Sequence, residues 1–265
     1  MHRFGTKSAE CPAEAIVAAI RARYASPGYR DESDPMPSER HSDLTVLRDQ
    51  LEQLQLPQIA YRRRAIIIFE GLEGSGKKQA LKQLAAAFDP CHYAVHTIGR
   101  DRREAADGHW LARFWRALPA AGHTSIFFRS WYRRVLDERV LGRVDAAAAA
   151  RAFDEINEFE AQQRDYGTLL VKLLFTVSAD VQDRRLRTRA ASPWAQLLRG
   201  DEPVRADDPA YLAALAELRA HTDTRWSPWR VIDGDDEQNV ASAALAAIAE
   251  AWAEAMPAEP IVSVA

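Results

Sequence analysis

A continuous apolar run that leads directly into a glycine-rich loop restricts the fold of this chain more than any other feature. The run AIIIFE at residues 65–70 has the length and β-branched content of a buried strand. GLEGSGKK follows it, and an amphipathic helical pattern begins within that stretch. The spacing G-x-x-x-x-G-K between a strand and a helix is that of a Walker A phosphate-binding loop. The sequence therefore predicts a P-loop, with an ordinary glycine-rich turn as the alternative.

The loop residues have distinct expected tasks at a phosphate site. Glycine lets backbone N–H groups turn inward around phosphate oxygens, which we expect of Gly71, Gly74 and Gly76. Lys77 would direct its ammonium group at the outer phosphates, and the N-terminus of the following helix adds positive potential. The Ser or Thr hydroxyl that usually follows this lysine and binds magnesium is replaced by Lys78. The loop thus predicts phosphate binding but lacks its usual metal ligand.

Apolar, strand-like runs alternate with helical patterns from residue 61 onward. Further strands are expected at residues 93–98, 124–128, 168–178 and 229–233. Amphipathic helices are expected at residues 77–88, 147–166, 179–189, 209–222 and 237–254. Continuously apolar strands separated by helices are typical of a parallel sheet that is covered on both faces. We expect a three-layer α/β/α fold with a central parallel sheet of about five strands.

Residues 1–60 differ in composition from the rest and are expected to form an N-terminal helical extension and linker. Residues 24–43 are rich in Pro, Ser and charged side chains, which is typical of a loop. A helix is expected to begin after a cap at Ser42 or Asp43. Its apolar stripe comprises Leu44, Leu47, Leu51 and Leu54. This stripe offers a surface either for packing on the chain's own domain or for a homo-oligomer.

The composition indicates a globular domain over residues 61–256, with residues 257–265 as a C-terminal tail. The chain of 265 residues is 47% hydrophobic, which is enough to bury a sizeable core. A formal charge of -3 gives no overall reason to expect a nucleic acid or an anionic membrane as a partner. Cys11 and Cys91 form no CxxC spacing, and no apolar stretch has the length of a signal peptide or a membrane span. We therefore expect a cytoplasmic location.

Five further stretches resemble the polyphosphate kinase 2 family in sequence and in order. They are FDP at 88–90, RFWRALPAAG at 113–122, FFRSWYRRVLDERV at 127–140, INEFE at 156–160 and GTLLVKLLFTVS at 167–178. With the loop, the resemblance runs from about Ile66 to Ile232. It implies a P-loop kinase-like fold with a helical lid. It also implies that phosphoryl groups pass between inorganic polyphosphate and a nucleoside mono- or diphosphate, with magnesium as the cofactor.

The resemblance, together with two clusters of arginines, suggests roles for individual residues. Lys77 matches the loop lysine of the family, and Arg129 matches an arginine beside the family's second catalytic aspartate. Residues 178–193 align with the start of the lid, whose arginines reach the phosphate chain. The predicted phosphate-binding residues are Gly71, Gly74, Gly76, Lys77, Arg133, Arg134, Arg184, Arg185 and Arg189. The predicted catalytic residues are Lys77, Arg129 and Glu73.

Three departures from the family pattern concern the metal. Phe128 stands where the family has aspartate, Glu73 replaces another aspartate, and Lys78 with Gln79 replaces a pair of glycines. An aromatic ring cannot coordinate magnesium, so Glu73 is the remaining candidate ligand for Mg²⁺. These departures are similar to those of the degenerate half in tandem-domain members of the family.

The sequence leaves three functions open. The first is a polyphosphate-dependent nucleotide phosphotransferase. The second is a polyphosphate- or nucleotide-binding regulatory module of the same fold that lost turnover through Phe128. The third is a small-molecule or nucleoside monophosphate kinase of the P-loop class, which would consume ATP without polyphosphate.

Overall fold

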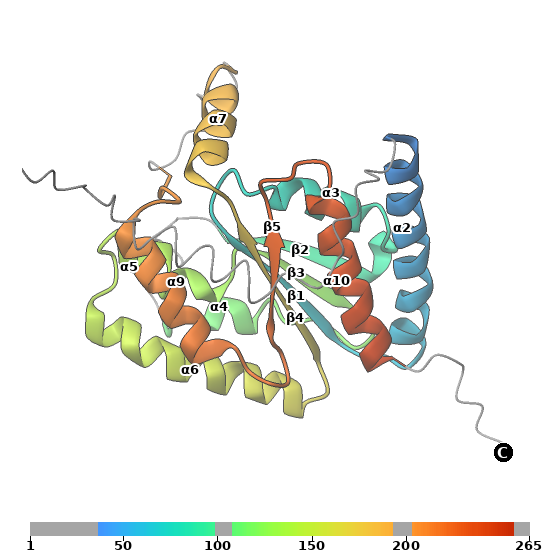
Figure 1. Ribbon diagram of the computed structural model, residues 1–265. Helices are drawn as coiled ribbons and strands as arrows, with labels where there is room; N and C mark the ends of the chain where they lie inside the picture. Colours follow the sequence, from blue (N-terminus) through green and yellow to red (C-terminus); the bar gives the residue numbers. More distant parts are fainter. Residues whose placement is uncertain (1–36, 99–107, 193–202, 257–265) are drawn as a thin grey trace, which may run out of the picture.

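A computed structural model describes residues 37–98, 108–192 and 203–256 of the chain (Figure 1). The predicted extension and linker up to residue 36 and the predicted tail from residue 257 lie outside the described residues. The end of the predicted lid at Pro193 also lies outside them.

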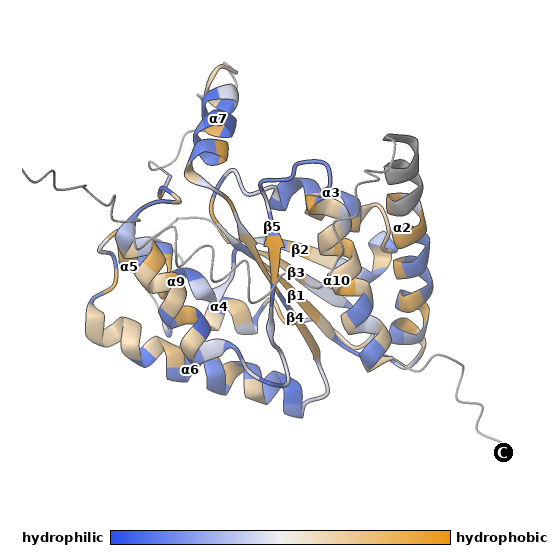
Figure 2. Ribbon diagram, viewed as in Figure 1, coloured by the Kyte–Doolittle hydropathy of each residue, from blue (hydrophilic) through white to orange (hydrophobic). Residues whose placement is uncertain are grey.

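The centre of the molecule is a five-stranded sheet in the order β2-β3-β1-β4-β5, with every neighbouring pair parallel. Its strands are β1 (Ala65–Gly71), β2 (Tyr93–Thr97), β3 (Thr124–Phe128), β4 (Leu169–Thr176) and β5 (Trp229–Asp233). Each lies within or next to a run that the sequence assigned to a strand. The predicted parallel sheet is confirmed. Figure 2 shows apolar residues concentrated along the strands, as expected of a sheet covered on both faces.

Helices cover both faces of the sheet and complete three layers (Figure 1). One face is covered by α2 (Pro37–Ala60), α3 (Lys77–Ala85) and α10 (Val240–Ala255). The other is covered by α4 (Ala112–Trp115), η3 (Trp131–Arg134), α5 (Asp137–Val140), α6 (Ala146–Asp165) and α9 (Pro209–Thr222). A short turn of helix, η1 (Pro90–His92), precedes β2, and α7 (Ala179–Ala190) stands beyond the end of β4. Among the described helices, none has the length and apolar character needed to cross a bilayer.

Strand β1 divides its side chains between two cores because successive residues of a strand point to opposite faces. Ile66 and Ile68 belong to the core beneath α6 and α9. Ile67 and Phe69 belong to the core beneath α3 and α10. All four side chains are fully buried. The strand is therefore fixed from both sides, and its C-terminal end holds the glycine-rich loop in place.

Helix α2 begins earlier and ends later than the sequence predicted. Residues 37–43 are helical, so the predicted loop does not reach residue 43 and neither Ser42 nor Asp43 caps the helix. Proline is typical of loops, but it is also tolerated in the first turn of a helix. Pro37 is the first residue of α2. Leu51 is fully buried, and the other leucines of the stripe pack partly buried against the core beneath α10. The stripe therefore packs on the chain's own domain.

Candidate phosphate-binding site

The glycine-rich loop joins β1 to α3 at the C-terminal edge of the sheet. Gly71 has φ +122°, and a Cβ atom there would lie 2.1 Å from the backbone oxygen of Phe175. Gly76, which precedes the first residue of α3, has φ +84°, and a Cβ atom would lie 2.8 Å from a methyl carbon of Val240. Larger residues would be strained at both positions and would displace a neighbour. The loop thus requires glycine for reasons of packing as well as conformation.

A cavity of about 620 Å³ opens over this loop. Its walls are the loop and the start of α3, the end of β3, the arginine-bearing face of α7, and Glu237. Six basic side chains line it, namely Lys77, Lys78, Arg129, Arg184, Arg185 and Arg189. The two carboxylates in the lining are Glu73 and Glu237. The excess of positive charge in a concave site favours an anionic ligand with several charges.

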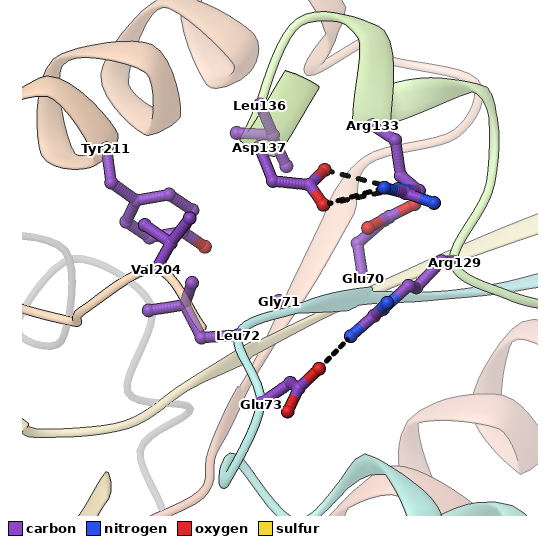
Figure 3. A pocket seen from close by; sticks show the side chains of 10 residues that line it. All are labelled: Glu70, Gly71, Leu72, Glu73, Arg129, Arg133, Leu136, Asp137, Val204 and Tyr211. Carbon is purple, nitrogen blue, oxygen red and sulfur yellow. Dashed lines mark hydrogen bonds and ion pairs between the residues drawn. The ribbon is translucent and has the colours of Figure 1, made fainter. Parts of the chain in front are cut away.

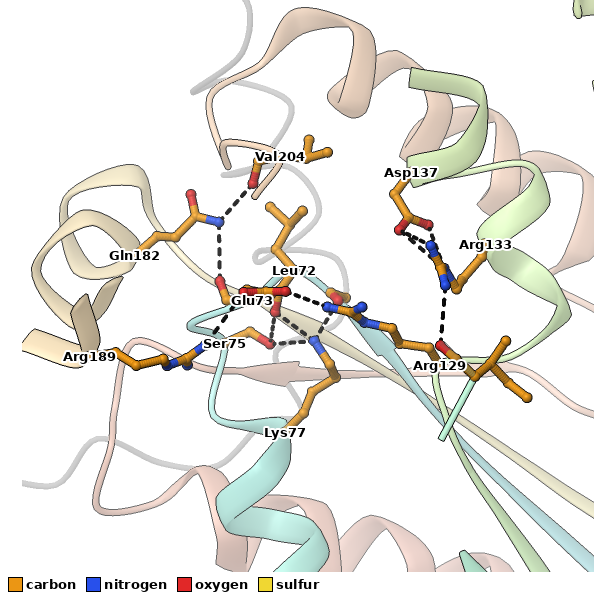
Figure 4. A network of polar contacts seen from close by, with 12 residues as sticks. Leu72, Glu73, Ser75, Lys77, Arg129, Arg133, Asp137, Gln182, Arg189 and Val204 are labelled. Atoms are coloured by element: carbon orange, nitrogen blue, oxygen red, sulfur yellow. Dashed lines mark hydrogen bonds and ion pairs between the residues drawn. The ribbon is translucent and has the colours of Figure 1, made fainter. Parts of the chain in front are cut away.

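Lys77 is bound to the loop itself. Its Nζ atom donates hydrogen bonds to the backbone oxygens of Gly71, at 2.5 Å, and Leu72, at 2.6 Å, and to Ser75 Oγ at 3.3 Å (Figure 4). Burial, and after it the nearby charge of Arg129, lower the pKa of Lys77 to about 7. The residue is only 4% exposed, so water does little to stabilise the charge of its ammonium group. A bound phosphate would stabilise that charge instead. An anion placed there would raise this pKa.

Glu73 connects the end of β3 to helix α7 (Figure 4). Its Oε1 accepts a hydrogen bond from Arg129 Nη2 at 2.7 Å, and its Oε2 accepts one from Arg189 Nη1 at 3.4 Å. Arg129 adopts φ +68°, and its backbone N–H donates to Phe69 O at 3.1 Å. This backbone turn directs the guanidinium back over the loop, where it meets the carboxylate.

Helix α7 is held against the loop by further hydrogen bonds. Arg185 Nη1 donates to the backbone oxygens of Gly74, at 2.7 Å, and Gly234, at 2.5 Å. Gln182 Nε2 donates to the backbone oxygens of Glu73, at 3.1 Å, and Val204, at 3.0 Å. Sequence analysis did not single out Gln182. Its position one helical turn before Arg185 was the available signal, because residues three apart share a face.

Two of the predicted phosphate-binding arginines lie elsewhere. Arg133 is 1% exposed, forms an ion pair with Asp137 at 3.2 Å, and donates to the backbone oxygen of Ile98. The guanidinium of Arg134 lies 4.9 Å above the ring of Trp110. Successive side chains of the short turn η3 point in different directions. Their position in the sequence just after a strand did not reveal this. The cavity therefore brings together four of the six predicted arginines, and neither Arg133 nor Arg134 lines it.

A second, much smaller cavity of about 30 Å³ adjoins the first (Figure 3). It shares Glu73 and Arg129 with the larger one, and Glu70, Asp137 and Tyr211 also line it. Glu70 accepts hydrogen bonds from Ser130 N at 2.6 Å and Ser130 Oγ at 2.7 Å, while burial raises its pKa. This space admits a water molecule or two and no nucleotide. Glu70 could have been noticed as a carboxylate at the end of an otherwise apolar strand.

Comparison with known proteins places this chain in a family. The family model described as polyphosphate kinase 2 matches residues 37–259, which is most of the chain. The chain belongs to the polyphosphate kinase 2 family. The resemblance seen in the sequence is thereby confirmed, and the match includes helix α2, which the sequence had assigned to an extension.

Individual relatives agree with this family assignment. A polyphosphate:AMP phosphotransferase of Acinetobacter johnsonii is 36% identical over 70% of this chain and 39% of its own length. A GDP-polyphosphate phosphotransferase of Mycobacterium tuberculosis is 33% identical over 80% of this chain and 72% of its own. A crystal structure described as polyphosphate kinase 2 from Pseudomonas aeruginosa matches with a TM-score of 0.76 and 27% identity, over 91% of this chain and 54% of that one. The match thus covers well under half the length of the Acinetobacter relative.

The donor atoms of this polyphosphate kinase 2 family member do not fit a magnesium ion held by the protein. Magnesium prefers an octahedral set of oxygen ligands. Both carboxylate oxygens of Glu73 accept hydrogen bonds from arginines, Lys78 occupies the hydroxyl position, and Phe128 ends β3. Within the described segments, no group of three or more His, Cys, Asp or Glu side chains is placed to hold a metal. The magnesium contact predicted for Glu73 would require this carboxylate to release an arginine, and it stays a prediction.

Proposed function

We propose that this protein transfers phosphoryl groups between inorganic polyphosphate and a nucleoside mono- or diphosphate. The observation that supports this most is the single cavity that unites the glycine-rich loop, Arg129 and the arginines of α7. Phosphoryl transfer requires little covalent chemistry from a protein. It depends on positioning the phosphates and on stabilising the negative charge that develops during transfer. A cavity with six basic side chains in its lining supplies both.

The basic residues divide this task by their position. In the proposal, Lys77 and the N-terminus of α3 bind the phosphates nearest the loop. Arg129 faces them from the end of β3, while Arg185 and Arg189 reach the cavity from α7. Guanidinium groups bind phosphate oxygens with two parallel hydrogen bonds, which fixes the orientation of a long phosphate chain. The relatives named for AMP and GDP make these nucleotides the first acceptors to test.

The proposal places the protein in the cytoplasm, where nucleotide acceptors are available, with neither nucleic acid nor membrane as its partner. A homo-oligomer remains compatible with this function. The amphipathic stripe of α2 already packs on its own domain, so an oligomer would use another surface.

The direct test is an activity assay with the purified chain. Protein is incubated with polyphosphate, magnesium and AMP, ADP, GMP or GDP in turn, and phosphorylated nucleotides are separated by chromatography. We expect product with the unmodified chain and none with Lys77→Ala. A yield equal to that of Lys77→Ala for every acceptor would reject the proposal. ATP in place of polyphosphate serves as a further arm, because an ordinary nucleotide kinase would use it.

Phe128 favours a second candidate, a module that binds polyphosphate without transferring phosphate. The ring lies in the cavity wall where the resemblance predicts a catalytic aspartate, and its centre is 5.9 Å from Lys77 Nζ. Binding that weakens with salt and with Arg184→Ala, without transfer, would support this candidate. Phe128→Asp combined with Lys78→Gly would then be expected to create activity.

A further inference from the structure

We propose that the cavity over the glycine-rich loop binds polyphosphate free of magnesium, and that Lys78 supplies the positive charge that a metal would otherwise bring. This inference rests on the proposed function and specifies the form of its ligand. Three observations carry it, concerning the charge at the start of α3, the state of the nearby carboxylates, and the end of β3.

The first observation is the charge at the start of α3. Lys78 is the second residue of this helix, its side chain is exposed, and it lines the cavity beside Lys77. Lys78, and Lys77 when it is protonated, therefore add ammonium groups to a helix N-terminus that is itself electropositive. A divalent cation in this position would be repelled, since like charges a few ångströms apart disfavour each other. A phosphate group would be attracted by both lysines and by the helix N-terminus.

The second observation is that the carboxylates at the cavity are already engaged. Glu73 accepts from Arg129 and Arg189, so its charge is neutralised by guanidinium groups. Glu237 is 74% exposed and lies 4.0 Å from Arg185. Neither offers a free, paired set of oxygens of the kind that holds magnesium in phosphate-transfer sites. An incoming metal would have to displace an arginine to bind Glu73, and Glu237 by itself would supply only one exposed carboxylate.

The third observation is the apolar end of β3. The ring of Phe128 lines the cavity and faces Lys77 in a cation–π contact. It provides no oxygen for a hydrated metal ion. Magnesium bound to the polyphosphate would instead neutralise part of the chain and compete with Lys77, Lys78 and the arginines for its oxygens. Magnesium is therefore expected to weaken binding.

The experiment measures polyphosphate affinity of the full chain by calorimetry, with EDTA or with magnesium, at matched ionic strength. We expect binding in EDTA that is at least as tight as binding with magnesium. Lys78→Gln should weaken binding in EDTA by about tenfold, the typical effect of one charged hydrogen bond to phosphate. Lys82→Gln is the matched control, because Lys82 lies on the same helix and is exposed, and it is not part of the cavity lining. It should leave the affinity unchanged.

A variant that should gain a dependence on magnesium makes the test specific to the metal. Phe128→Asp with Lys78→Gly supplies a carboxylate and removes a charge, so this variant should bind polyphosphate more tightly with magnesium than with EDTA. Binding by the unmodified chain that is weaker in EDTA than with magnesium would overturn the inference while leaving the proposed function intact. Binding in neither condition would reject polyphosphate as the ligand, and with it both the inference and the proposed function.

Discussion

Lys77 is a buried lysine whose charge is sensitive to pH near neutrality. Burial is the main cause of its pKa of about 7, and hydrogen bonds to two loop carbonyls hold its ammonium group where a phosphate would bind. A bound phosphate would favour the charged form and raise this pKa. Proton uptake and phosphate binding are therefore coupled at this residue.

We expect polyphosphate binding to take up protons at this lysine. Between pH 7 and the higher pKa of the complex, the free protein has lost protons that the bound protein retains. Affinity should then fall as pH rises through this window, by at most about tenfold per unit, and Lys77 should add no pH dependence below it. Calorimetry in buffers of different ionisation enthalpy measures the uptake. Lys77→Met should abolish the contribution of this residue and Lys82→Met should not; equal uptake in all three proteins would contradict the assignment.

Glu73 competes with phosphate for two arginines. Its carboxylate already forms ion pairs with Arg129 and Arg189, and its negative charge lies in a site suited to anions. Glu73→Gln should therefore raise polyphosphate affinity by about threefold to tenfold, a modest effect because these pairs are partly exposed and screened by solvent. Fluorescence titration with labelled polyphosphate measures the change. Glu237→Gln is the control, because that carboxylate is more distant from its arginine and largely exposed. A lower affinity in Glu73→Gln would show that the carboxylate helps to bind the ligand.

At the scale of elements, a buried polar cluster joins four parts of the fold behind the site. Lys172 of β4 and Glu160 of α6 form an ion pair at 3.1 Å, with both side chains fully buried. Glu160 also accepts hydrogen bonds from Trp131 Nε1 at 2.9 Å and Tyr132 Oη at 2.5 Å, both in η3. Lys172 donates to the backbone oxygen of Thr222, at the end of α9. The cluster fixes η3, and η3 follows the turn that orients Arg129.

Removing one partner of the Lys172–Glu160 ion pair should lower the free energy of unfolding substantially. Lys172→Met leaves the carboxylate of Glu160 buried without its ammonium partner, and such losses cost about 3–5 kcal/mol. Lys172→Met with Glu160→Gln removes both charges and should recover part of that loss. Urea denaturation of the single and double variants forms the double-mutant cycle. Additive effects would indicate that the two charges do not interact.

At the scale of the whole molecule, helix α2 completes the layer that covers one face of the sheet. Leu51 is fully buried in the core that also contains Trp252 of α10 and Ala80 of α3. The family match begins at residue 37, the first residue of this helix. Helix α2 therefore contributes to the stability of the kinase-like domain.

Leu51→Ala should lower the free energy of unfolding by about 2–5 kcal/mol, the usual cost of a cavity left by a buried leucine. Val46→Ala on the same helix is the control, because Val46 is 63% exposed and should change stability by less than about 0.5 kcal/mol. Urea denaturation followed by circular dichroism measures both. Similar losses in the two variants would contradict the packing of α2 on α10.

The sequence by itself determined the architecture and the lineage of this protein. Runs such as AIIIFE are typical of strands covered on both faces, and the glycine spacing that follows is typical of a phosphate-binding turn from strand to helix, so local chemistry indicated these elements. Only the tertiary structure decided how side chains divide between core and cavity. Arg133 turned inward to Asp137 while Arg129 turned toward Glu73, because Arg133 lies in η3 whereas Arg129 precedes it in a backbone turn with φ +68°. The engagement of Glu73 by arginines from β3 and α7 joins residues up to 116 positions apart, a contact that no local pattern encodes.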